Sequence, residues 1–241
     1  MACWRCGERS SVNTATERGS RLGWWAWCLA LALPTLVLHV SLSPALSLSH
    51  VPLDQAVSAW PDVPRALVLQ PDAGLAQPPW VWWTTAWLHG STPHLVRNLV
   101  GLALLAVWAA ASRPSRATVA ALWLAWPLTQ LGMLMEPSLG AYVGLSGVLH
   151  AGLVVLSLGA LAITTPWPLR AGALALLLGT ATKVHMENPW GAALVASPES
   201  GILVAPWAHL SGCVAGALSI AVAAGLARGW QRWPPRQRRC H

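Results

Sequence analysis

Six apolar runs, each about as long as a bilayer is thick, constrain this chain more than any other feature. A membrane-spanning helix needs roughly 20 predominantly apolar residues, because its backbone polar groups must all be satisfied inside the hydrocarbon. Only 10% of the 241 residues are charged, and 55% are hydrophobic. The runs predict an all-α membrane protein with six spans, over residues 23–43, 94–111, 117–135, 144–163, 169–187 and 206–227.

The basic residues predict the orientation of these spans, because Lys and Arg are retained on the cytoplasmic side of short loops. Twelve of the fifteen lie on one side of a six-span arrangement: Arg5, Arg9, Arg18, Arg21, Arg113, Arg116, Arg170, Arg228, Arg232, Arg236, Arg238 and Arg239. Six of the eight acidic residues lie on the other side or at its edge. We therefore expect both termini to be cytoplasmic, with an N-terminal segment over residues 1–22, a membrane domain over 23–227 and a basic tail over 228–241. The tail is interpreted as a topology signal that contacts anionic lipid, with no nucleic-acid partner.

A serine and a histidine stand inside two of the predicted spans, where polar side chains are costly and usually functional. Ser146 begins the fourth span between Gly144 and Gly147, and His209 begins the sixth span one turn before Gly212. Both spans run inward from the outer surface, so the two side chains are expected at similar depth. A neutral imidazole within hydrogen-bond reach can act as the base that makes a serine nucleophilic. The glycines would permit close helix approach.

Two further polar residues begin the second span. His94 and Asn98 are four residues apart and therefore share a helix face near the outer surface. Both can donate hydrogen bonds to an oxyanion formed by attack of Ser146.

With these three pieces the sequence resembles the rhomboid family of intramembrane serine proteases. The segment HGSTPHLVRN matches the family's H-x4-H-x3-N pattern, GLSG matches its G-x-S-G, and AHLSG matches its final-helix histidine and glycine. The resemblance implies a six-helix rhomboid-like bundle with Ser146 as nucleophile and His209 as general base. It implies an oxyanion hole of His94, Asn98 and the Ser146 backbone N–H, with His89 in a structural role. It implies no metal and no cofactor.

His150 stands where many rhomboids carry an aromatic residue against the base, and the first outer loop lacks the family's common Trp-Arg pair. In these respects the chain looks like the rhombosortase branch, whose substrates carry a C-terminal glycine-rich motif, a transmembrane helix and a basic tail. The resemblance implies a bacterial inner-membrane enzyme that cuts such membrane-anchored proteins on the extracytoplasmic side. Position 150 lies one turn below Ser146, so its ring is expected to stack on His209, with or without tuning the base.

Lys183 and Glu187 lie four apart at the outer end of the fifth span, where an unpaired charge would be costly. We expect them to pair with each other or with the site, as a structural ion pair in preference to a substrate contact. The CxxC of Cys3 and Cys6 has no second pair that would complete a zinc site.

Three alternatives remain at this point. A general rhomboid protease would cut substrates that have a destabilised transmembrane helix, and it would not need the C-terminal glycine-rich motif and basic tail. An inactive rhomboid-like protein that escorts membrane clients would lack a complete dyad, and Ser146 and His209 are both present. A small transporter would show an internal repeat or paired broken helices, which this sequence does not.

Overall fold

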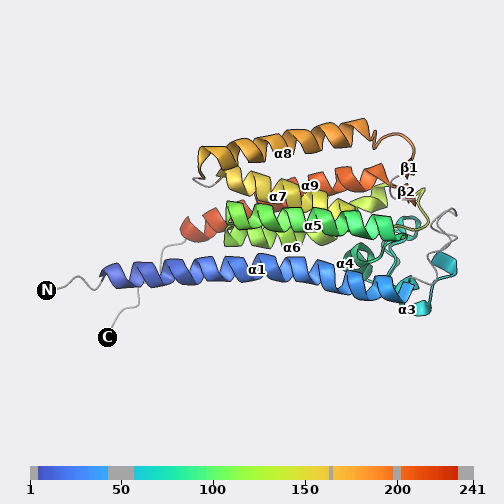
Figure 1. Cartoon of the computed structure of the whole chain (residues 1–241), viewed down its shortest axis with the longest axis horizontal. Helices are drawn as coiled ribbons and strands as arrows, with labels where there is room; N and C mark the ends of the chain where they lie inside the picture. Colours follow the sequence, from blue (N-terminus) through green and yellow to red (C-terminus); the bar gives the residue numbers. More distant parts are fainter. Residues whose placement is uncertain (1–4, 43–56, 163–164, 198–201, 233–241) are drawn as a thin grey trace.

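The computed structural model describes residues 5–42, 57–162, 165–197 and 202–232. Within these ranges six long helices run back and forth along a common direction, and each predicted span coincides with one of them (Figure 1). They are α1 (Arg5–Leu42), α5 (Thr92–Ser112), α6 (Arg116–Leu131), α7 (Ser146–Ala162), α8 (Trp167–Met186) and α9 (Pro206–Arg232).

Four helical segments are long and apolar enough to cross a membrane: Ser20–Ser41 in α1, Thr92–Ser112 in α5, Arg116–Met135, which is α6 with the helical turn that follows it, and Pro206–Gly229 in α9. Helix α7 is apolar but has 17 residues, and α8 carries Lys183 and His185 in its last turn. The start of α1 and the end of α9 lie at one end of the bundle, whereas α5, α7 and α9 begin at the other (Figure 1). The fold is thus that of a mostly helical protein with membrane-spanning character.

Two helices continue beyond the predicted spans. Helix α1 already begins at Arg5, inside the segment 1–22 that we expected to precede the membrane domain, and α9 continues to Arg232 in the predicted tail. A helix nucleated in an apolar run extends at little cost into a flanking polar sequence without proline. Neither extension contains proline, and the next one after α9 is Pro234.

The centre of the bundle is formed by α6, α7 and α9, with α1 and α5 packed against one side. Fully buried side chains include Trp27 of α1, Trp126 of α6 and Leu145 just before α7. Helix α8 lies on the side away from α1 and contacts mainly α7 (Figure 1). It buries only Ala173, Thr180 and Val184, so it is a peripheral helix.

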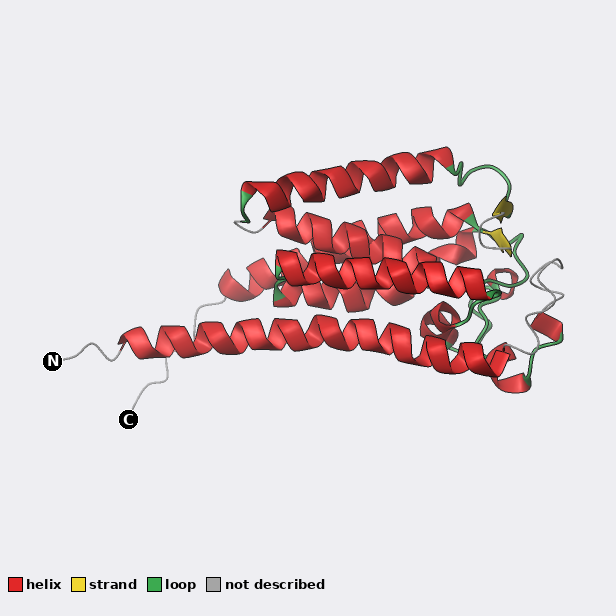
Figure 2. Cartoon of the chain, viewed as in Figure 1, coloured by secondary structure: helices red, strands yellow, loops and turns green. Residues whose placement is uncertain are grey.

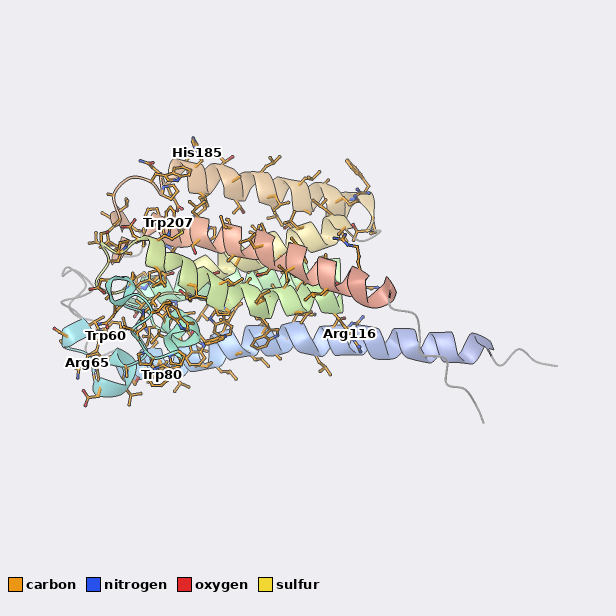
Figure 3. All side chains as sticks on the ribbon, turned by 180° about the vertical axis from the view of Figure 1, so that it is seen from behind. Trp60, Arg65, Trp80, Arg116, His185 and Trp207 are labelled. Carbon is orange, nitrogen blue, oxygen red and sulfur yellow. The ribbon has the colours of Figure 1, made fainter. Side chains whose placement is uncertain are left out.

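Short elements cover the end of the bundle at which α7 and α9 begin (Figure 2). They are α3 (Asp62–Arg65), η2 (Pro71–Ala73), α4 (Val81–Thr84), η3 (Thr85–Trp87), η4 (Gly132–Met135) and the antiparallel hairpin of β1 (Val195–Ser197) and β2 (Ile202–Val204). Viewed from behind, Trp60, Trp80, His185 and Trp207 all lie at this end, and Arg116 lies toward the opposite one (Figure 3).

The tryptophans that precede α5 lie in different environments. Trp80 is half-exposed, but Trp82 is buried in the core of this end. The indole N–H of Trp126 donates to the backbone carbonyl of Trp83 at 3.1 Å. Part of this stretch is therefore a packing element, because an indole buries a large apolar surface wherever its N–H finds an acceptor.

Candidate active site

Ser146 is the first residue of α7, and the extended segment before it is held by the covering elements. The Tyr142 backbone N–H donates to the carbonyl of Leu69 at 2.8 Å, and the Gly144 N–H donates to that of Thr85 at 3.1 Å. The Thr85 hydroxyl donates to the Tyr142 carbonyl at 2.5 Å. Burial raises the pKa of Tyr142, so its phenol group stays neutral beside the start of α7. These bonds fix the backbone that presents Ser146.

His209 lies in the first turn of α9, which approaches α7 with almost no side chain between the two backbones. A Cβ built on Gly147 would lie 2.8 Å from the Ala208 carbonyl oxygen, and one on Gly216 would lie 2.6 Å from that of Ala151. A Cβ on Gly212 would overlap the Gly147 carbonyl oxygen. The predicted close approach at Gly212 is therefore present. Only glycine allows helices to pack at this separation.

Helix α6 fixes the start of α9 from the other side. The Trp207 indole donates to the Gly132 carbonyl at 2.9 Å, and the Ser211 hydroxyl donates to the Thr129 carbonyl at 2.7 Å. These two anchors flank His209, so its backbone position is set by contacts on both sides.

The result is a hydrogen bond between the Ser146 Oγ and the His209 Nε2, 3.0 Å apart, although 63 positions separate the residues. His209 is 7% exposed. A hydroxyl and an imidazole nitrogen at this distance can exchange a proton when the oxygen attacks an electrophile.

His150 lies one turn below Ser146 on α7, and its ring stacks on that of His209 with centroids 4.2 Å apart and planes 21° apart. Its Nδ1 donates to the Ser146 carbonyl at 2.7 Å. Because a carbonyl only accepts, the His150 Nδ1 carries the proton of this bond, and the bond fixes the orientation of the His150 ring. The stacking expected from the spacing is present, and it restrains the plane of His209.

Lys183 and Glu187, at the end of α8, form the expected ion pair, with the Lys183 Nζ 2.6 Å from the Glu187 Oε1. The second oxygen, Oε2, lies 2.6 Å from the His209 Nδ1. Each carboxylate oxygen therefore has its own partner, the Lys183 ammonium at Oε1 and the His209 ring at Oε2.

His94, near the start of α5, packs against the segment that precedes the serine. A Cβ on Gly144 would lie 2.9 Å from the Cε1 of His94, and Gly144 has φ +130°, which favours glycine. The His94 ring is buried and 4.8 Å from that of His89. The His94 Nδ1 has no hydrogen-bond partner within the described part of the chain.

Asn98 lies one turn further along α5 and is also buried. Its Nδ2 is 2.8 Å from the Nε2 of His89, so one amide proton of Asn98 is used by this histidine. The arrangement brings His89, His94 and Gly144 into one cluster beside the start of α7, with Asn98 connected to it through His89.

The sequence left open whether Lys183 and Glu187 pair with each other or with the site, and the structure shows both contacts. The contact with His209 depends on the rotation of α8 relative to α9, which the spacing of the two residues does not specify. The support from Thr85 had no signal, because a threonine in a loop forms such bonds only through tertiary packing. Of the five cysteines, Cys3 and Cys240 and the side chain of Cys6 lie outside the described residues. Cys28 and Cys213 are free thiols.

Comparison with known proteins gave no match to a family model, a curated protein or a solved structure.

Proposed function

We propose that the protein is an intramembrane serine endopeptidase of the rhomboid type, with six membrane spans and both termini in the cytoplasm. The observation that carries the proposal is the 3.0 Å contact between the Ser146 Oγ and the His209 Nε2, made between two apolar helices. Helices α7 and α9 carry the two residues in their first turns, and both helices begin at the end of the bundle opposite the start of α1 (Figure 1). With basic residues cytoplasmic, this end opens to the extracytoplasmic side.

The dyad would act by acyl transfer. Ser146 Oγ bonds to the peptide carbonyl carbon while its proton passes to His209 Nε2. The tetrahedral intermediate carries an oxyanion, which the neighbouring donors His94, Asn98 and the Ser146 backbone N–H are proposed to stabilise. Collapse breaks the C–N bond, and the Nε2 proton passes to the leaving amine. Water then gives one proton to Nε2 and its oxygen to the acyl carbon, the ester bond breaks, and the proton returns to Ser146.

The substrate we propose is a membrane-anchored protein with a C-terminal glycine-rich motif, a transmembrane helix and a basic tail, as in the rhombosortase branch. This class rests on the motif resemblance and on His150, which occupies the position beside the base. A general rhomboid protease that needs no such tail is the alternative. A bacterial inner membrane is the proposed location, with lipid as the only other partner.

The test uses the purified full chain in detergent and a fluorophosphonate probe. It also uses two membrane-anchored reporters: one carries the C-terminal glycine-rich motif, transmembrane helix and basic tail, and in the other the glycines of that motif are replaced by leucines. Wild type should be labelled and should cut the first reporter, and Ser146→Ala should do neither. Mass spectrometry of the new C-terminus locates the cut. The matched control is Ser157→Ala on the same helix, whose buried hydroxyl has no partner among the described residues.

Equal cleavage of both reporters would favour the general rhomboid protease. Cleavage by Ser146→Ala at the wild-type rate would contradict the serine-protease proposal. A folded wild type that neither cuts nor takes up the probe would favour a client-binding protein.

A further inference from the structure

We propose that Glu187 is a positioning residue that completes a Ser146–His209–Glu187 triad, and that Lys183 holds its carboxylate in place. This inference rests on the proposed function, because it assigns a role within the same site. It extends the two-residue dyad by a third member supplied by α8.

The two oxygens of Glu187 have different partners. Oε2 lies 2.6 Å from the His209 Nδ1, on the edge of the ring opposite Ser146. Oε1 lies 2.6 Å from the Lys183 Nζ, one turn earlier on the same helix. A carboxylate held by an ammonium at one oxygen has little freedom to leave the imidazole at the other. The geometry is that of a base oriented by a third group.

The carboxylate also selects the tautomer of His209. An ionised carboxylate only accepts hydrogen bonds, so the Nδ1 that faces it carries the proton. The neutral ring then has a lone pair on Nε2, directed at the Ser146 hydroxyl 3.0 Å away. This is the form that can take the serine proton.

Lys183 acts on the same nitrogen in the opposite sense. Its Nζ lies 3.4 Å from the His209 Nδ1, and an ammonium only donates. If Lys183 were the only neighbour of Nδ1, it would favour a lone pair on Nδ1 and the proton on Nε2, which is the form that cannot act as a base. The carboxylate prevails in the wild type because it is 2.6 Å away, against 3.4 Å for the ammonium.

The other groups around His209 do not accept a hydrogen bond from its Nδ1, so Glu187 is the acceptor. The face of the ring is covered by His150 of α7, Nε2 faces Ser146, and His94 of α5 is close enough to interact with the ring electrostatically. Helix α8 supplies Lys183 and Glu187, and His185 between them is exposed (Figure 3). Of these groups, only Glu187 is an acceptor for the Nδ1 proton.

Four variants of the full chain test the inference: Glu187→Gln, Glu187→Asp, Lys183→Met and the double variant Glu187→Gln/Lys183→Met. The matched control is His185→Gln, a change of a titratable side chain on the same turn that does not face the site. The measurements are the second-order rate of fluorophosphonate labelling, kcat and KM on the cleaved reporter, the pH–rate profile, and the melting temperature.

Loss of the carboxylate in soluble triad proteases lowers kcat by about 10⁴-fold. The Glu187 side chain is 28% exposed and so partly screened, and we expect Glu187→Gln to lower kcat and labelling by about 10²- to 10³-fold with KM within about threefold. Glu187→Asp should recover part of the loss. The double variant should exceed Glu187→Gln by several-fold, because the ammonium that favours the wrong tautomer has gone. His185→Gln should match wild type.

A role in packing alone would not move the pH–rate profile. Glu187 favours the protonated imidazole, so in Glu187→Gln the acid limb should move to lower pH, whereas Lys183→Met should move it to higher pH. Wild-type labelling and an unmoved acid limb in Glu187→Gln would overturn the inference, and the serine-protease function would stand if Ser146→Ala remains unlabelled. If wild type itself is neither labelled nor active, the proposed function and this inference fail together.

If Glu187→Gln loses activity together with melting temperature, the comparison with Glu187→Asp and with the double variant decides. Recovery of rate in the double variant without recovery of melting temperature supports the tautomer mechanism. Recovery of both together, or of neither, contradicts it.

Discussion

The close contact between α7 and α9 is predicted to set the reactivity of Ser146, and Gly212→Ala tests this most directly. The new Cβ would overlap the Gly147 carbonyl oxygen and lie 2.9 Å from its carbonyl carbon, where ordinary contacts begin at 3.4 Å. Both neighbours are backbone, so α9 has to move away from α7 by about 0.5 Å or more. The His209 Nε2 would then stand about 3.5 Å or more from the Ser146 Oγ, beyond a normal hydrogen bond.

Misplacement of this size in an active site costs up to about 10²-fold in rate. Overpacking costs about 1–3 kcal/mol in the free energy of unfolding. The assay is the rate of fluorophosphonate labelling, measured beside thermal unfolding in the same detergent. Gly225→Ala is the matched control, since a Cβ there meets nothing within 4 Å on the same helix; it should label like wild type. A folded Gly212→Ala that labels at the wild-type rate would refute the view that backbone contact sets the dyad distance.

Three further predictions concern the groups around the dyad. His94→Ala should lower kcat by about 10²-fold with little change in KM, and Asn98→Ala by less, because one amide proton of Asn98 is already used by a histidine; equal losses of melting temperature and activity would indicate a structural role instead. His150→Tyr should label within about tenfold of wild type because its ring can still stack on the base, and His150→Ala should label more slowly; an unchanged rate in His150→Ala would show that stacking is dispensable. Protonation of the Glu187 carboxylate at low pH would weaken its contacts with Lys183 and His209; thermal unfolding from pH 7 to 3 should therefore show the difference in melting temperature between wild type and Glu187→Gln narrowing over the acid range, and a constant difference would contradict this.

The positions of the helices follow from hydropathy, because each predicted span coincides with one helix of the structure. The pairing of Ser146 with His209 was also predictable, since both begin a helix at the same end of the bundle. His150 followed from helical periodicity, which places residues four apart on one face. These features depend on local spacing and chain direction, which a sequence specifies.

Contacts that depend on how one element is rotated against another were not predictable. The spacing of Lys183 and Glu187 predicts their mutual pair but leaves open which way the free carboxylate oxygen points. The burial of Trp82 and the Thr85 bond to Tyr142 arise from the packing of residues 57–91 over the end of the bundle, and no local pattern in that segment specifies it. Asn98 was assigned by its helix face to oxyanion binding, and its bond to His89 emerged only with the positions of both side chains.

The distribution of the dyad between α7 and α9 has a consequence for biosynthesis. A ribosome makes Ser146 first and His209 63 residues later, on the last helix of the described part of the chain. On the proposed function, the Ser146 hydroxyl would have no base until α9 has docked against α7 and α6. Reactivity would then arise only on completion of the bundle, so the order of synthesis itself would delay proteolysis.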